Sequence, residues 1–544
     1  MNFSRLDGEE IGDVLIRLGY VTEEQIISIL SMQLRIPVVK LDYYPINRNI
    51  FYLIPDHLIR NHCLIPLDLN NDQLIIAVSD PLDLGVLDEI KMITGYEVFP
   101  VISSVREIKE VITRYYDLLQ PIYETSPQMV GVKKEEEQNG KEAVDTRIIV
   151  DKEQAPAVRL VDLVIKQAVE QRSSDIHFEP KDGGLKIRYR IDGILRDTIS
   201  LPVEITPAII SRLKIMANMD IAEKRVPQDG RISLNVGGKK IDLRLSTLPT
   251  ILGEKIVIRI LDKSQGIIKM QNLGMSDSHL KLFQKMLRYP YGMILATGPT
   301  GCGKTTTLFS GLETINSPQK NIITIEDPVE YTLEGVNQVQ VNVKAGLTFA
   351  NGLRAILRQD PDVIMVGEIR DSETADIAIR SAMTGHLVLS TLHTNDAVST
   401  ISRLVDMGIE PFLLSSALIG VISQRLVRVI CNNCKLSYPA EEDRYISFFL
   451  LPQEYRGKML YKGNGCSQCQ GTGYKGRIGI YEILEVNGEI RDLIGARLSV
   501  ERMRNITKPL GMISMFKDGL EKAFAGITTV DEIMRVTFAE EGGK

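Results

Sequence analysis

The sequence predicts an α/β protein built from several domains, and three observations lead to this prediction. The chain has 544 residues, which at about 150 residues per domain suggests three or four domains. Hydrophobic residues make up 44% of the chain and charged residues 25%, close to the averages of globular proteins. After about residue 263, apolar strands alternate with helical patterns, as is typical of a parallel sheet with helices on its faces.

The composition excludes a globally basic protein. Against 64 Lys and Arg stand 70 Asp and Glu, which gives a net charge of −6, and we therefore expect no nucleic-acid partner. The chain begins without a basic region followed by an apolar stretch, and it has no run of about 18 uninterrupted apolar residues. Its 6 cysteines are too few for a disulfide framework. We expect a cytoplasmic protein without a membrane span.

Residues 1–118 are expected to form an N-terminal domain with a helical part followed by an α/β part. Apolar residues recur at helical spacing up to about residue 50, and Thr22 followed by Gln25 is typical of a capping box. From Leu64 onward, two alternating strands, a helix and a further strand at residues 98–102 are predicted.

Two further segments precede the α/β domain. Residues 119–155 are polar and charged and show no periodicity, which predicts a flexible linker. A helical pattern at 157–171 leads into five strand patterns, which predicts a small α+β domain over residues 156–262. Residues 263–544 then form the predicted α/β domain.

A phosphate-binding loop is predicted near the start of this last domain. The motif G-x-x-x-x-G-K-T follows the apolar strand MILAT and precedes a helical segment, which is the context that such a loop requires. Backbone N–H groups would face the phosphates, Lys304 would reach the β and γ oxygens, and Thr305 would ligate Mg²⁺. The predicted nucleotide-contacting residues here are Gly298, Pro299, Thr300, Gly301, Cys302, Gly303, Lys304, Thr305 and Thr306.

Two later strands end in carboxylates that suit nucleotide hydrolysis. The strand at 363–366 leads to Glu368, which we expect to hold Mg²⁺ through water because the usual Asp is absent. Another apolar strand precedes Glu326, Asp327 and Glu330, and carboxylates at strand ends can orient and deprotonate water. The alternative is that each of these carboxylates is solvated at a strand end or in a loop and has no role in hydrolysis.

Two pairs of cysteines predict a zinc site. Cys431 and Cys434 form one C-x-x-C pair, and Cys466 and Cys469 form another. Each pair supplies two of the four thiolates of a tetrahedral structural zinc site. A dithiol redox role is the alternative, but it requires fewer cysteines.

GPTGCGKT, TIEDPVEY, LRQDPDVIMVGEIRD and TGHLVLSTLHTN occur in this order. They resemble the Walker A, Asp box, atypical Walker B and His box of the secretion ATPase superfamily of type II secretion and type IV pilus motors. The resemblance covers nearly the whole chain. It implies a RecA-like P-loop ATPase domain preceded by a PAS-like α+β domain, with ATP, Mg²⁺ and Zn²⁺ as cofactors.

The resemblance also implies roles for single residues. Glu330 is similar to the general base of the Asp box, which also contains Glu326 and Asp327, and Glu368 is similar to the Walker B glutamate. His393 resembles the γ-phosphate sensor of the His box, with His386 as its companion.

Four arginines resemble arginines that act at the nucleotide site of the family. Arg354 and Arg358 correspond to residues that line the site. Arg244 and Arg259, in the preceding domain, correspond to arginines that reach the phosphates, where a cation would stabilise transition-state charge.

The function implied by the resemblance is that of a homohexameric ATPase that drives pilin polymerisation in type IV pilus assembly. It would act as a peripheral protein docked on a platform protein of the inner membrane. The alternative is the type II secretion ATPase. A nucleic-acid translocase is a rival of another class, which the net charge of −6 disfavours.

The N-terminal helices resemble a domain that holds cyclic di-GMP in some family members. Glu10 stands where the ligand-binding version has a phosphate-pairing Arg. This substitution favours a docking module for the inner-membrane platform and leaves cyclic di-GMP binding as the alternative.

Overall fold

The computed structural model describes residues 20–41, 50, 53–70, 73–112, 156–262, 266–448, 457–496, 500–507 and 511–537. The chain divides into two compact units, one comprising Met1–Val236 and Asp242–Ile260 and the other Gly237–Ile241 and Leu261–Lys544. The predicted linker at 119–155, Glu10 and the first predicted helix lie outside the described residues. The domain boundaries given above stay a prediction.

The first unit contains a three-stranded sheet near its N-terminus. Strand β1 is antiparallel to β2, and β2 is parallel to β3. Thr22 caps the first described helix in the predicted capping box, since its hydroxyl accepts from the Gln25 N–H at 3.3 Å and its N–H donates to Gln25 Oε1 at 2.9 Å. The elements are α2 (Glu23–Leu34), α3 (Asp56–Asn61), β1 (Leu64–Asn70), β2 (Gln73–Val78), α4 (Leu84–Thr94), β3 (Glu97–Ile102) and α5 (Val105–Val111).

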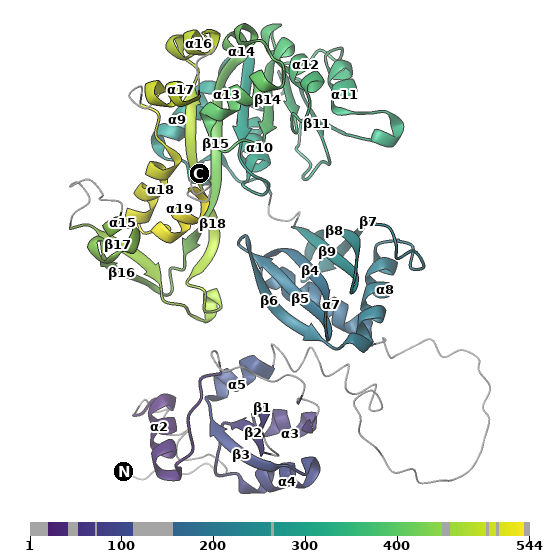
Figure 1. Ribbon diagram of the computed structural model, residues 1–544, viewed down its shortest axis with the longest axis vertical. Helices are drawn as coiled ribbons and strands as arrows, with labels where there is room; N and C mark the ends of the chain where they lie inside the picture. The colour runs from purple at the N-terminus through teal and green to yellow at the C-terminus, as the bar shows by residue number, and fades with distance from the viewer. Residues whose placement is uncertain are drawn as a thin grey trace. The chain divides into compact units, whose positions relative to one another are not determined.

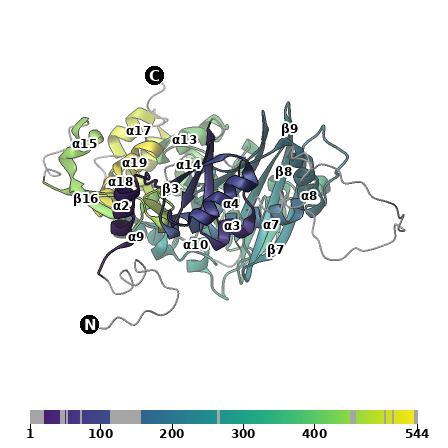
Figure 2. The same ribbon diagram turned by 90° about the horizontal axis from the view of Figure 1, so that it is seen from below.

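The same unit contains a six-stranded sheet in the order β6-β5-β4-β9-β8-β7. Helix α7 packs against β4 and also contacts α8 (Figure 2). The hydroxyl of Tyr189, on β5, donates to the carbonyl of Val164 in α7 at 2.9 Å. The predicted helix and five strands are confirmed, and the structure adds α8 and β9. The elements are α7 (Pro156–Glu170), β4 (Ser173–Lys181), β5 (Gly184–Ile191), β6 (Ile194–Leu201), η4 (Val203–Ile205), α8 (Thr206–Met216), β7 (Gln228–Val236), β8 (Lys239–Thr250) and β9 (Gly253–Asp262).

The second unit is built on a seven-stranded sheet in the order β12-β11-β13-β14-β10-β15-β18. All neighbours from β12 to β15 are parallel, and β18 adds an antiparallel edge. This confirms the predicted α/β fold. The strands are β10 (Gly292–Thr297), β11 (Ile322–Glu326), β12 (Asn337–Gln340), β13 (Val363–Val366), β14 (Leu387–Leu392), β15 (Leu418–Ile430) and β18 (Tyr474–Glu485).

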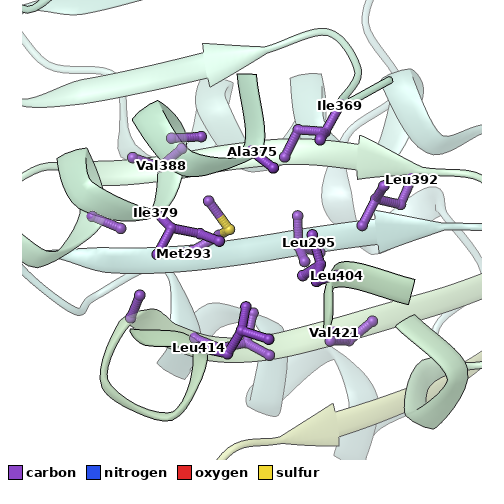
Figure 3. Close-up of a cluster of buried hydrophobic side chains, with 14 of the residues drawn as sticks. Met293, Leu295, Ile369, Ala375, Ile379, Val388, Leu392, Leu404, Leu414 and Val421 are labelled. Atoms are coloured by element: carbon purple, nitrogen blue, oxygen red, sulfur yellow. The ribbon is translucent and has the colours of Figure 1, made fainter. Parts of the chain in front are cut away.

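Helices cover both faces of this sheet, so the central strands are apolar throughout. In β10, Met293 and Leu295 belong to one buried cluster (Figure 3), whereas Ile294 and Ala296 belong to the cluster on the opposite face. None of the described helices is long and apolar enough to cross a membrane. The helices are η6 (Met270–Asn272), α9 (Asp277–Met286), α10 (Lys304–Ile315), η7 (Val343–Ala345), α11 (Phe349–Ile356), α12 (Ser372–Met383), α13 (Ala397–Asp406), α14 (Pro411–Ala417), α16 (Gly488–Gly495) and α17 (Val500–Thr507).

Strands β15 and β18 extend beyond the sheet as a two-stranded ribbon that leads to a small subdomain (Figure 1). There, β16 pairs with β17 in antiparallel fashion, and α18 and α19 pack on them through a small apolar cluster. The elements are β16 (Lys435–Pro439), η8 (Ala440–Glu442), α15 (Arg444–Phe448), β17 (Met459–Gly463), η10 (Ser467–Cys469), α18 (Met515–Phe524) and α19 (Val530–Thr537).

Candidate nucleotide site and metal centre

The phosphate loop connects the carboxyl end of β10 to the first turn of α10. Gly298, Gly301 and Gly303 have φ angles of 146°, 77° and 91°, a region that side chains with a Cβ rarely adopt. A Cβ at Gly298 would lie 2.6 Å from the Gln424 carbonyl oxygen, so this glycine also permits close packing against β15. Gly303 is the N-cap of α10, so the loop delivers its backbone to the helix N-terminus, where anions bind.

Lys304 lies folded over this loop. Its Nζ donates to the carbonyl of Gly298 at 2.7 Å and to that of Pro299 at 3.1 Å, and only 8% of the residue is exposed. Burial lowers the pKa of Lys304, while the negative charge of Glu368 acts in the opposite direction. An ammonium group held by neutral carbonyls is well placed to exchange them for phosphate oxygens.

The acidic residues lie at the C-terminal ends of neighbouring strands. The phosphate loop lies at the same end of the sheet, its carboxyl edge. Glu326 ends β11, Glu368 follows β13 and His393 follows β14, and these strands are adjacent in the sheet. In open α/β sheets this edge is where ligands bind. The predicted carboxylates therefore share one edge with Lys304.

Glu368 lies between Arg370 and His393. Its Oε1 accepts from Arg370 and its Oε2 is 3.4 Å from His393 Nε2. Burial raises the pKa of Glu368, but the hydrogen bond and charge of Arg370, assisted by His393, outweigh burial, so the pKa lies below its ordinary value. The carboxylate is therefore charged at neutral pH, as a group that acts through metal-bound water requires.

The carboxylates of the predicted Asp box lie in different environments. Glu326 is 2% exposed, and its Oε1 accepts from Thr324 at 2.6 Å and from Gln338 at 3.0 Å. Burial raises the pKa of Glu326. Asp327 Oδ2 lies 3.9 Å from Arg370, and Glu330 is half-buried in the following loop. Glu326 therefore suits a structural role, and Glu330 is the more exposed of the two glutamates.

The four predicted cysteine ligands lie together between the ends of β15 and β18. All four sulfur atoms are within 4.8 Å of one another. The Sγ atoms of Cys431 and Cys466 are 3.8 Å apart, as are those of Cys434 and Cys469. Four sulfurs about 2.3 Å from a tetrahedral zinc would be about 3.8 Å apart. The backbone N–H groups of Cys466 and Gly473 donate to Cys469 Sγ at 3.1 and 3.2 Å, which orients this thiolate.

A sequence model described as "Type II/IV secretion system protein" matches residues 150–535, well over half of the chain. The chain belongs to this family. A second model, the MshEN domain, matches residues 34–121.

Two similar proteins and one solved structure illustrate this relationship. The type IV pilus assembly ATPase PilB of Myxococcus xanthus is 42% identical over 536 residues, which is 97% of this chain and 94% of that protein. The type II secretion system ATPase E of Vibrio cholerae is 42% identical over 490 residues, which is 88% of this chain and 95% of that protein. The structure of the ATPase DotB of Legionella pneumophila shares the fold, with a TM-score of 0.53 and 20% identity over 73% of this chain and 98% of that chain.

As a member of the type II/IV secretion system protein family with an intact phosphate loop, the chain is an ATPase that uses ATP and Mg²⁺. A Cβ at Gly301 would meet no atom within 4 Å beyond its own chain neighbours, so this part of the loop is open. The four-cysteine cluster has the spacing that a structural zinc site requires.

The structure does not bring every predicted residue to this edge. His386 precedes β14, next to Gly292 at the amino end of β10, where the His386 carbonyl accepts from the Gly292 N–H at 3.1 Å. The 6 residues of β14 at about 3.3 Å each separate it from His393, so His386 lies at the opposite edge of the sheet and is removed from the site within one subunit.

Arg354 lies on the exposed face of α11, and Arg358 is exposed in the turn that follows this helix. Arg354 is paired with Glu373 of α12 at 2.7 Å, and Arg358 donates to the Arg354 carbonyl at 2.8 Å. In the first unit, Arg244 lies on β8, and Arg259 of β9 lies 3.3 Å from Asp175 Oδ1. A role for these arginines at the nucleotide remains a proposal.

Sequence reasoning missed two residues at the site. Arg370, which holds Glu368, directly follows the GEI of the predicted Walker B strand, so its position could have suggested a pairing role. Gln424 contacts the phosphate loop from β15, 122 residues from its partner Cys302, and no local pattern indicates it.

Proposed function

We propose that this chain is a hexameric motor that hydrolyses ATP to drive type IV pilus assembly. The observation that carries the proposal is the similarity to a type IV pilus assembly ATPase over 97% of this chain and 94% of that protein, N-terminal region included. A similarity limited to the P-loop domain would support ATP hydrolysis but not this particular process.

The proposed chemistry assigns one task to each group at the sheet edge. Lys304 leaves the carbonyls of Gly298 and Pro299 and binds the β and γ phosphates. Thr305 and Glu368 would hold Mg²⁺, Glu368 through water, and the bound ion would supply positive charge to the phosphates. Glu330 takes the proton from the attacking water.

Two further groups control charge at the γ-phosphate position. His393, 3.4 Å from Glu368, is proposed to exchange this carboxylate contact for the γ-phosphate. Arg244 and Arg259 are proposed to come from a neighbouring subunit and stabilise the transition state, while Arg354 and Arg358 line the same site. Hexamer formation supplies the neighbour that these arginines require.

The cellular setting is also part of the proposal. The motor associates peripherally with a platform protein on the cytoplasmic side of the inner membrane, where the pilin polymerises. The N-terminal domain, part of which matches the MshEN domain, serves as the docking module. Cyclic di-GMP as its ligand is the alternative, which Glu10 disfavours because an anion repels phosphate.

The second candidate function is the type II secretion ATPase. It is favoured by the 42% identity to a type II secretion system ATPase over 88% of this chain and 95% of that protein. Both functions use the same site, so the geometry of the nucleotide pocket does not separate them.

Deletion of the gene in its host tests the proposal, with complementation by the wild type and by Lys304→Ala. Loss of surface pili with normal secretion of enzymes is expected, restored by the wild type and not by Lys304→Ala. Retained pili with blocked secretion would assign the chain to type II secretion instead.

A further inference from the structure

Gln424 of β15 holds the phosphate loop from behind. It is 1% exposed, and both ends of its side-chain amide are used. Its Nε2 donates to the carbonyl of Cys302 at 2.7 Å, and its Oε1 accepts from the hydroxyl of Thr307 at 2.8 Å. One buried amide therefore joins the last part of the loop to the first turn of α10.

The bond to Cys302 fixes the direction of a loop N–H group. The carbonyl of Cys302 and the N–H of Gly303 belong to one trans peptide, in which the two groups point in opposite directions. Because Gln424 holds the carbonyl on the β15 side, the Gly303 N–H is turned away from β15. The backbone N–H groups of a P-loop are those that cradle phosphates.

Packing supports the same arrangement. A Cβ at Gly303 would lie 3.1 Å from Gln424 Nε2, so the side chain lies directly against the Cα of this glycine. Thr307 is 1% exposed, so its hydroxyl bond to Gln424 is shielded from water. Removing one partner would leave a buried polar group unpaired. The loss in folding free energy would exceed the stability that an exposed hydrogen bond provides.

We propose that Gln424 is a positioning residue for nucleotide binding, which sets the phosphate loop in its binding conformation through Cys302 and Thr307. The inference rests on the proposed P-loop site. It assigns a role in ATP turnover to a side chain that does not itself touch the nucleotide.

The test measures Mg·ADP affinity by calorimetric titration together with the melting temperature of the full-length protein. Gln424→Met keeps the volume but removes both hydrogen bonds. We expect its affinity for ADP, and its kcat/KM for ATP, to fall about tenfold or more, since two buried hydrogen bonds set the loop. Thr307→Val removes one of these bonds and should show a smaller loss in the same direction, which keeps the test usable if Gln424→Met folds poorly.

Asn321→Leu is the matched control. The Asn321 side-chain amide also donates two hydrogen bonds, to the carbonyls of Gln359 at 2.8 Å and Asp360 at 2.9 Å, but at the amino edge of the same sheet. We expect this variant to melt earlier and to keep wild-type ADP affinity.

Two results would overturn the inference in distinguishable ways. If Gln424→Met melts earlier but binds ADP as tightly as the wild type, Gln424 is a structural residue only. If Lys304→Ala binds and hydrolyses nucleotide normally, the proposed phosphate site itself is wrong, and the role of Gln424 falls with it.

Discussion

At the scale of single residues, environment separates carboxylates that the sequence places side by side. Glu326 and Glu330 belong to one motif, yet Glu326 is 2% exposed and bonded to Thr324 and Gln338. Glu330 is half-buried, in the loop after the strand. A buried carboxyl that is already hydrogen-bonded is poorly suited to accept a proton from water, so the two residues are expected to respond differently to neutralisation.

Glu330→Gln should lower kcat at least about 100-fold, because a general base contributes at least that much. ADP affinity should stay unchanged, since the amide preserves the shape of the side chain. Steady-state kinetics and calorimetric titration measure the two quantities. Glu334→Gln, an exposed carboxylate in the same loop, is the control. Hydrolysis by Glu330→Gln at the wild-type rate would show that another group is the base.

Glu326→Gln should stabilise the protein increasingly as the pH rises. Burial raises the pKa of Glu326 in the folded state. The carboxyl therefore contributes its full stability at acid pH, and this contribution is lost as the pH rises through the raised pKa. The Glu326→Gln variant does not titrate at this position, so the difference in melting temperature between variant and wild type should grow as the pH rises above the ordinary pKa of a glutamate.

The exposed residue Glu313 of α10 provides a control for this pH series. The difference in melting temperature between Glu313→Gln and the wild type should not change with pH. A constant difference for Glu326→Gln as well would contradict the assignment of a buried, protonation-prone carboxyl.

At the scale of elements, one ribbon connects the phosphate loop to the metal centre. Gln424 lies within β15, and Cys431 directly follows the end of that strand. β18 pairs with β15 from Gly420 to Ile430, with one irregularity between Arg428 and Ile430. The sequence predicts the two cysteine pairs from their local spacing, whereas their convergence depends on this strand pairing.

The double variant Cys431→Ser with Cys434→Ser should lose the bound zinc, which we expect at about one ion per chain. Elemental analysis of the purified protein measures it. Amide hydrogen exchange of β16 and β17 should accelerate in the variant and after chelation, because metal binding there stabilises the local fold. Cys63→Ser, outside the cluster, should keep its zinc. Full zinc content in the double variant would exclude this set of ligands.

At the scale of the whole molecule, the proposed motor depends on cooperation between subunits. If Arg259 acts on a neighbouring subunit, Arg259→Ala chains can supply an intact phosphate loop and Lys304→Ala chains can supply the arginine. Mixed hexamers of these two inactive variants should therefore recover part of the ATPase activity. Lys304→Ala mixed with Lys304→Ala/Arg259→Ala is the control and should stay inactive. No recovery in the first mixture would place Arg259 outside the neighbouring site.

The sequence by itself determined the phosphate loop, the acidic strand ends, the cysteine pairs and the α/β class. These depend on local spacing: the apolar run of β10 is buried on both faces, as its composition predicts. The tertiary structure decided that Glu368 lies against Arg370 and His393, that His386 lies at the opposite edge, and that Gln424 holds the loop. Strand order and register bring Gln424 to Cys302, 122 positions away, and because packing selects that order, no short segment of the chain encodes it.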